Sequence, residues 1–400
     1  MRVVWRDMIV RQFLHWIRTA AAGERAEATS ALARAYLFSD LSPDDRAAAE
    51  GAMLILLDDP SPLVRRALAE VFASSQKAPP AIVHALAGDQ ADIAVPVLER
   101  SPLLLDADLV DLVATGCSQK QVAVARRAPL PRAICAAIAE VGSPASCLAL
   151  IENADAEIAP FSLNRLVERH GHLPPIREVL LARDDVAAPT RQALVAKLSE
   201  TLAGFVAERA WLDEDRAQRV AREACERATV VLAVESPPTE MRPLIRHLRS
   251  SGQLTAGLIL RALLCGSVAL FEEALAELSD LSLTRVSALL YDRGGAGLRA
   301  LFEKAGLPAS AYPAFREAIT AMQEVGFVGD ARDAARLKRR MTERVLTRCE
   351  QDAPGGIEPL LTLLRRFATE AAREEARAFC EELVAGSRLV AGADDRLAAA

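Results

Sequence analysis

Residues 58–70 read Asp-Asp-Pro-Ser-Pro-Leu-Val-Arg-Arg-Ala-Leu-Ala-Glu, and their pattern recurs along the chain. The aspartates and prolines break the backbone, because proline lacks the amide hydrogen that a helix interior needs. An apolar-basic pair, Val64 and Arg65, then opens a new amphipathic segment. The stretch therefore predicts a turn followed by a helix.

The apolar positions of this stretch return at a fixed interval. Val64, Ile93 and Val122 are equally spaced along the chain. The same spacing separates the members of a second set, Leu54, Val83 and Leu112. A repeat of this kind, with helical periodicity inside each unit, is typical of stacked helix pairs. We therefore expect these side chains at the interfaces between neighbouring units.

The composition favours an all-α fold. Hydrophobic residues make up 51% of the 400 residues but aromatic residues only 4%, so Ala, Leu, Val and Ile must build the core. Alanine and leucine are strong helix formers, whereas a β-sandwich would be richer in aromatic residues and threonine. The formal net charge of −6 disfavours a general nucleic-acid binder, which needs a basic face, but leaves room for a local basic patch.

Changes in pattern divide the chain into four predicted segments. Residues 1–45 form N-terminal amphipathic capping helices, and residues 46–200 form the repeat array. Residues 201–330 form a second all-helical lobe, and residues 331–400 form charged helices and a tail.

The first repeat resembles a HEAT repeat. The second helix of that repeat typically begins with an acidic residue, a Val-Arg pair and a buried alanine. Asp59, Val64-Arg65 and Ala67 stand at those places, whereas the later units keep only the apolar positions. The resemblance implies a HEAT-like α-solenoid of stacked helix pairs. A weaker self-similarity between residues 262–272 and 288–303 predicts a second helical-repeat lobe, on which this array packs.

The chain also resembles a bacterial family known as domain of unknown function 2336. Besides residues 58–70, the resemblance is carried by residues 86–104, 122–130 and 150–158, and it extends from about 45 to 320. The family has no established activity, so the resemblance implies a fold rather than a reaction.

We predict no catalytic residue, no cofactor and no metal site, and hence no enzyme. His170 and His172 form a close pair with only Glu168 nearby, whereas a metal site needs three or four ligands. The glycine-rich residues 292–297 could form an anion-binding loop but lack the Gly-Lys-Ser/Thr ending of a phosphate loop. Seven cysteines without a Cys-x-x-Cys pair indicate a reducing, cytoplasmic location.

Four arginines are the predicted partner-binding residues. Arg65, Arg66, Arg126 and Arg127 lie on the second helices of the first and third units, and such helices tend to line a concave face. Guanidinium groups bind carboxylates and phosphates in a bidentate manner, so they suit an acidic peptide. The alternative is that they pair with acidic side chains along the array, Asp58, Asp59, Glu70 and Glu99.

Three functions are consistent with these patterns. The leading one is a non-enzymatic scaffold that binds a protein or peptide on its concave face. The second is nucleic-acid binding, in which the basic helix 331–348 would take part unless it pairs with the acidic helix 370–382.

The third is a peripheral membrane or signalling adaptor. Helix 1–18 is amphipathic, and Trp5, Phe13 and Trp16 would touch the membrane, although this helix could equally cap the end of the array. No transmembrane segment is predicted, because Arg261 interrupts the longest apolar run.

Overall fold

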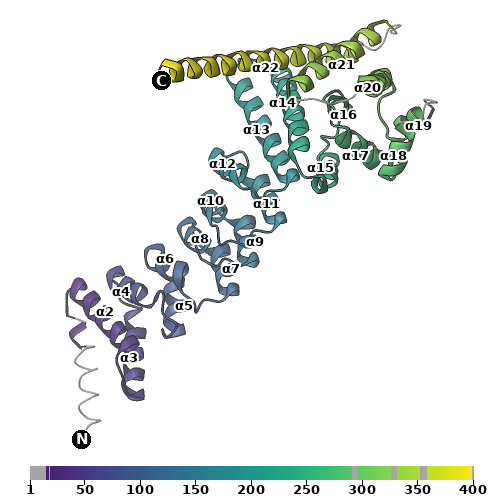
Figure 1. The fold of residues 1–400 in the computed structure, drawn as a ribbon. Helices are drawn as coiled ribbons and strands as arrows, with labels where there is room; N and C mark the ends of the chain where they lie inside the picture. Colours follow the sequence, from purple (N-terminus) through teal and green to yellow (C-terminus); the bar gives the residue numbers. More distant parts are fainter. Residues whose placement is uncertain (1–14, 18, 291–295, 326–330, 352–357, 399–400) are drawn as a thin grey trace. The chain divides into compact units, whose positions relative to one another are not determined.

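The computed structural model describes residues 15–17, 19–290, 296–325, 331–351 and 358–398 (Figure 1). Within these ranges the chain is helical with short turns and contains no strand, which confirms the all-α prediction. The contacts group the chain into two compact units, Met1–Val186 and Ala187–Ala400, here called the N-terminal and C-terminal units. The four-segment division stays a prediction.

Short helices follow one another in the N-terminal unit. They are α2 (Ala22–Phe38), α3 (Pro43–Leu56), α4 (Pro62–Phe72), α5 (Pro80–Gly88), α6 (Ala91–Arg100), α7 (Asp106–Thr115), α8 (Ser118–Ala125), α9 (Arg132–Val141), α10 (Pro144–Glu152), α11 (Pro160–His170) and α12 (Pro174–Ala182). Six of them begin with proline, whose fixed φ angle suits the first helical position and whose missing amide hydrogen is not needed there. The prolines therefore mark helix starts, and Pro62 begins the helix that the stretch 58–70 predicts.

Alternate helices of this unit pack on one another. In one layer α4 packs on α6, α6 on α8, α8 on α10 and α10 on α12 (Figure 1). In the other layer α7 packs on α9, and α9 packs on α11. From α6 to α10 in the first layer, and for α9 in the second, a helix therefore packs against the helices two places before and after it in the sequence, whereas α5 packs on α6.

The predicted spacing of interface residues holds from Val64 to Ile93 but not from Ile93 to Val122. Val64 and Ile93 are both completely buried, but Val122 is only half-buried, and its neighbours Gln121 and Ala123 are buried. The cause is that the helix-pair repeats differ in length. The interval between the first residues of α6 and α8 is two residues shorter than the interval between the first residues of α4 and α6. Because a helix turns about 100° per residue, a difference of two positions carries a side chain to another face.

The second set was assigned wrongly at two of its three positions. Val83 is completely buried, whereas Leu112 is half-buried and Leu54 is 40% exposed on α3. Leu109, three positions before Leu112, is buried in α7 instead. The helix-pair repeats thus differ slightly in length. The helices still pack in pairs, but a different residue faces the interior in each repeat.

Side chains that follow one helix cap the carboxyl end of an earlier helix in the same layer. Arg127 donates to two carbonyl oxygens at the end of α6, at 2.5 and 2.7 Å. Asn153 does the same for α8, at 2.8 and 2.7 Å, and Arg183 donates to one carbonyl at the end of α10, at 2.8 Å. The last four carbonyls of a helix have no hydrogen-bond partner within the helix. These bonds supply partners for some of them and link successive helix pairs.

Arg127→Ala is expected to lower the free energy of unfolding of the N-terminal unit by about 1–3 kcal/mol, because charge-assisted bonds to two carbonyls are lost. Amide hydrogen exchange should quicken at the end of α6. The control is Arg126→Ala, which removes an exposed neighbour and should change little. Equal effects of the two substitutions would show that the capping bonds are not stabilising.

The C-terminal unit contains longer helices. They are α13 (Ala188–Glu208), α14 (Glu214–Glu235), α15 (Pro238–Ser250), α16 (Ala256–Leu264), α17 (Val268–Ser279), α18 (Leu283–Leu290), α19 (Ala296–Lys304), the 3-10 turn η1 (Ala309–Ala311), α20 (Tyr312–Val325), α21 (Ala331–Gln351) and α22 (Glu358–Ala398). Helices α13 and α14 form a hairpin, and α15 and α16 pack on it (Figure 1). The core includes Phe315, whose ring lies 6.1 Å from that of Phe271 and 5.2 Å from that of Phe302.

Oppositely charged faces join α21 to α22. Lys338 Nζ lies 2.7 Å from a carboxylate oxygen of Glu374, and Arg339 Nη1 lies 2.9 Å from one of Glu375. The alternative in which the basic helix pairs with the acidic helix of the same chain is therefore confirmed for these residues.

Candidate functional site

Two of the four predicted partner-binding arginines are used inside the N-terminal unit. Arg65 binds the carboxylate of Asp89 at 2.6 Å and donates to the carbonyl of Asp59 at 2.6 Å. The hydrogen bonds that Arg65 donates to Asp89 raise the pKa of Arg65 and keep it charged. Arg127 caps α6 and is half-buried. Both side chains thus link neighbouring helices of the array.

The other two arginines are exposed and lie in one groove. Side-chain exposure is 55% for Arg66 on α4 and 64% for Arg126 at the end of α8. The groove between them has a volume of about 460 Å³. We call it the α6 groove; it is lined by Arg66, Asp92, Val95, Pro96, Glu99, Ser118, Gln119, Val122, Ala123, Arg126 and Ala145.

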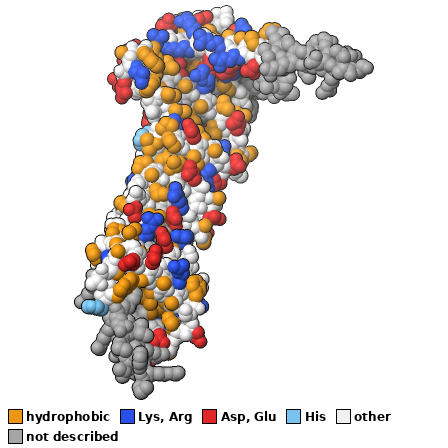
Figure 2. All heavy atoms as spheres, turned by 90° about the vertical axis from the view of Figure 1, so that its left-hand side faces the viewer, with side chains coloured by type: hydrophobic (Ala, Val, Ile, Leu, Met, Phe, Trp, Pro, Cys, Tyr) orange, Lys and Arg blue, Asp and Glu red, His pale blue; other side chains and the backbone are white. Residues whose placement is uncertain are grey.

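The α6 groove combines a half-buried apolar floor with charges of both signs. Arg66 pairs with Glu70 at 2.9 Å, and Arg126 lies 3.9 Å from Glu99. These are two of the acidic partners that the sequence suggests. Exposed ion pairs are worth about 0–1 kcal/mol, so a partner can replace them at little cost. Acidic and basic side chains also alternate with hydrophobic ones over the N-terminal unit in Figure 2.

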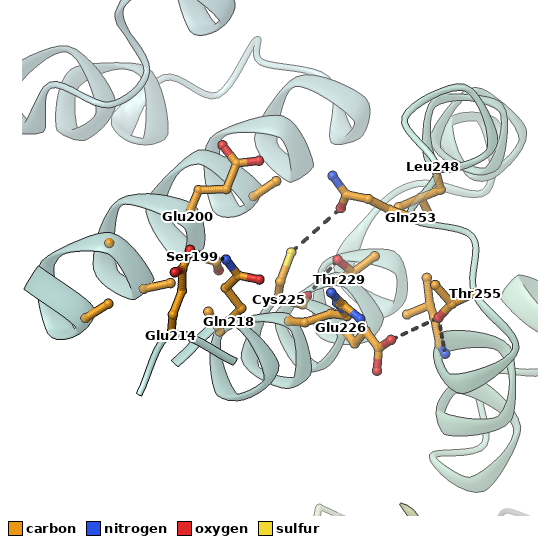
Figure 3. Close-up of a pocket in the computed structure, with 18 residues that line it drawn as sticks. Ser199, Glu200, Glu214, Gln218, Cys225, Glu226, Thr229, Leu248, Gln253 and Thr255 are labelled. Atoms are coloured by element: carbon orange, nitrogen blue, oxygen red, sulfur yellow. Dashed lines mark hydrogen bonds between the residues drawn. The ribbon is translucent and has the colours of Figure 1, made fainter. Parts of the chain in front are cut away.

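A second concave site lies in the C-terminal unit, where the sequence predicts none. A cavity of about 580 Å³ is bounded by α13, α14 and the segment from the end of α15 to the start of α16 (Figure 3). Gly252 has a φ angle of 69°, a conformation that favours glycine, and it ends the turn after α15. The amide groups of Gln253 and Leu254 then bind back to the carbonyl of Leu248, which fixes this wall.

A network of polar side chains adjoins this cavity, and Cys225, Glu226, Gln253 and Thr255 of the network line it. Gln192 of α13 donates to Gln253 Oε1 at 2.5 Å and bonds to His247 Nε2 at 3.0 Å. Cys225 Sγ lies 3.8 Å from the same Gln253 oxygen, and Glu226 accepts a bond from Thr255 Oγ1 at 2.9 Å (Figure 3). The network connects α13, α14, α15 and the start of α16.

Burial shifts the titration of this network. Desolvation raises the pKa of Glu226, although the bond from Thr255 and the charge of Arg261 act in the other direction. Desolvation also raises the pKa of Cys225 and lowers that of His247. The thiol is therefore protonated at neutral pH and is a poor nucleophile.

A family model described as an uncharacterised protein conserved in bacteria, DUF2336, matches residues 93–354, more than half of the chain. The chain belongs to the DUF2336 family. No curated protein matches the chain, and no solved structure matches it.

The DUF2336 match starts and ends later than the range of about 45–320 that the resemblance suggests. It contains every residue that lines the cavity of the C-terminal unit, and it contains Arg126. Arg66 and the stretch 58–70 lie before it, so the HEAT-like resemblance rests on residues outside the family match.

The cavity has a weak signal in the sequence of this DUF2336 protein. Ala196, Ala203, Gly204 and Ala207 repeat small side chains along one face of α13. Such a pattern usually marks close helix packing. Nothing in the sequence indicates that Gln253 and Thr255 face this stripe, because a loop after α15 brings them there.

The remaining predicted positions contribute no described site. Trp5 and Phe13 lie outside the described residues, as do residues 291–295 of the glycine-rich loop, whereas Trp16 is exposed. No group of three or more metal-binding side chains occurs among the described residues. In the same ranges, no helix combines the length and apolar character needed to span a bilayer.

Proposed function

We propose that the chain is a non-enzymatic scaffold with a HEAT-like α-solenoid, which binds a protein or peptide along the layer formed by α4, α6, α8, α10 and α12. In this proposal the layer is the concave face. The proposal is carried by one observation: Arg66 and Arg126, which come from different helix pairs, line the same groove.

An acidic, extended peptide suits this groove. Carboxylates of the peptide would replace Glu70 at Arg66 and Glu99 at Arg126, and two exposed ion pairs offer little resistance to such exchange. Guanidinium groups bind carboxylates through two parallel hydrogen bonds, which adds orientation to the attraction. The half-buried Val95, Pro96 and Val122 would contact apolar side chains between the peptide's charges.

The double variant Arg66→Glu, Arg126→Glu is expected to weaken binding to the best peptide of an acidic peptide array by about tenfold or more, since like charges would then meet. Fluorescence polarisation with the labelled peptide measures this change.

The matched control is Arg132→Glu, which reverses an exposed charge outside the α6 groove, beside Glu157. This variant should bind normally. Unchanged affinity in the double variant, or an equal loss in the control, would reject the groove as the binding site.

A further inference from the structure

The cavity of the C-terminal unit is a slot along the antiparallel hairpin of α13 and α14, with the segment from the end of α15 to the start of α16 as its third side. Its wall on α13 consists largely of Ala196, Ala203, Gly204 and Ala207. Because these side chains are small, they leave the space open. The lining residues of α14 extend from Glu214 to Thr229, which corresponds to about 22 Å of helix. The volume of about 580 Å³ is within the range of small-molecule sites.

Carboxylates outnumber cations along this slot. Glu200, Glu214 and Glu226 line it, and Arg222 is the one cationic side chain among its lining residues. Glu214 is the first residue of α14, and Glu226 lies about 18 Å further along the helix axis. Glu200 approaches from α13, on the other side of Cys225 from Glu226 (Figure 3). Glu200 also pairs with Lys197 of its own helix at 3.0 Å, and a ligand can replace this exposed pair at little cost. Negative charge is thus spread along the slot, beside the small side chains of α13.

Glu226 retains unused capacity to accept hydrogen bonds. Its side chain is only 12% exposed, and one oxygen accepts the bond from Thr255. The cation nearest its other oxygen is Arg261, whose Nε is 3.8 Å away and therefore beyond hydrogen-bond distance. Nη1 of Arg261 is already bound to Glu370 at 2.6 Å. A donor that enters the slot would therefore find a charged acceptor at its inner end.

We propose that this slot binds a linear aliphatic polyamine. Ammonium groups would bind Glu226, Glu200 and Glu214, and the methylene segments between them would lie against the alanines of α13 and α14. The ligand matches the slot in its narrow, elongated shape, in the sign of its charge and in the alternation of charged and apolar sections. This site is separate from the α6 groove and does not depend on the proposed scaffold function.

Isothermal titration of the full chain with spermidine and with spermine tests the proposal. We expect saturable binding at physiological salt, and a rise in melting temperature with each polyamine. Citrate, which would bind if Arg222 dominated the site, should have no effect. A lysine-rich peptide should not compete, because its backbone and side chains need more room than a slot of about 580 Å³ offers.

Two variants locate the site. Gly204→Leu should abolish binding, since Gly204 lines the slot, a Cβ atom added there has no neighbour within 4 Å, and the rest of the side chain would occupy the slot. Glu226→Gln should weaken binding by about tenfold or more, through the loss of a charge-assisted bond. Glu235→Gln, at the exposed end of α14, is the matched control and should bind normally.

Several results would overturn the proposal. They are the absence of binding at millimolar polyamine, tighter binding of citrate or of the lysine-rich peptide, full binding by Gly204→Leu, and equal losses in Glu226→Gln and Glu235→Gln. The last of these would show that polyamines respond only to the net negative charge of the chain.

Discussion

Replacement of Arg261 by alanine is expected to lower the free energy of unfolding of the C-terminal unit by about 3–5 kcal/mol, the cost of leaving buried charges without a partner. Arg261 lies on α16 and is 2% exposed. Its Nη1 binds both carboxylate oxygens of Glu370 on α22, at 2.6 and 2.8 Å. Its guanidinium also lies 4.2 Å from the centre of the Phe367 ring.

Removal of the Arg261 guanidinium would affect two carboxylates at once. Glu370 would keep only Arg227, at 3.7 Å, and Glu226 would lose the cation at 3.8 Å. Urea unfolding followed by circular dichroism measures the change, and hydrogen exchange should show loss of protection in α22, which Arg261 anchors.

Arg299→Ala is the control for this prediction. Arg299 forms an exposed pair with Glu303 on α19, and its removal should cost about 0.5 kcal/mol or less. The double variant Arg261→Met, Glu370→Met should recover much of the loss, since apolar residues can replace a buried ion pair. If Arg261→Ala were no less stable than Arg299→Ala, the buried pair would not hold α22 in place.

The helices could be predicted from the sequence because their signals are local. Pro62, Pro80, Pro144 and Pro160 each begin a helix, and each is visible without knowledge of the fold. The spacing of buried residues was harder to predict, because the helix-pair repeats differ slightly in length. A change of two positions turned Val122 partly toward solvent although Val64 and Ile93 are buried.

The orientation of a residue around its helix also decides which candidate arginines are exposed. Arg65 and Arg66 are adjacent and chemically identical, yet one faces Asp89 and the other faces the groove. Which member of such a pair is exposed depends on the register of the helix, and the sequence alone does not define that register to a single residue. The cavity was harder still to predict, since α13, α14 and the loop after α15 build it from residues that are far apart in the sequence, from Ala196 to Leu258.

Val64→Asp is expected to destabilise the N-terminal unit by about 5–6 kcal/mol at pH 7, the sum of a protonation cost and a loss of apolar burial. Val64 is completely buried in α4, which packs between α2 and α6. A carboxylate placed there without a cation must take up a proton, and protonation at pH 7 costs about 4 kcal/mol for a group with an ordinary pKa near 3.9. The lost apolar burial of valine adds about 1.5 kcal/mol.

The adjacent residue provides a matched control for this prediction. Leu63 is 57% exposed, so Leu63→Asp introduces the same carboxyl group one position away and should cost about 1 kcal/mol or less. Chemical unfolding of both variants measures the loss of stability, and hydrogen exchange shows whether α4 loses protection. The comparison separates the effect of burying the carboxyl group from the effect of aspartate on helix propensity. Similar losses in the two variants would mean that Val64 does not lie in the interface between α4 and its neighbours.

The pH dependence of the Val64→Asp penalty tests its cause. Burial raises the pKa of the introduced carboxyl in the folded state above its unfolded value, so the folded state binds the extra proton. The penalty should therefore shrink by about 1.4 kcal/mol for each pH unit below 7, and level off near pH 4 where the unfolded chain is also protonated. A penalty that stayed constant between pH 7 and pH 5 would instead indicate that the site opens to water, and that α4 is held by its ion pairs, such as Arg65 with Asp89, rather than by its apolar face.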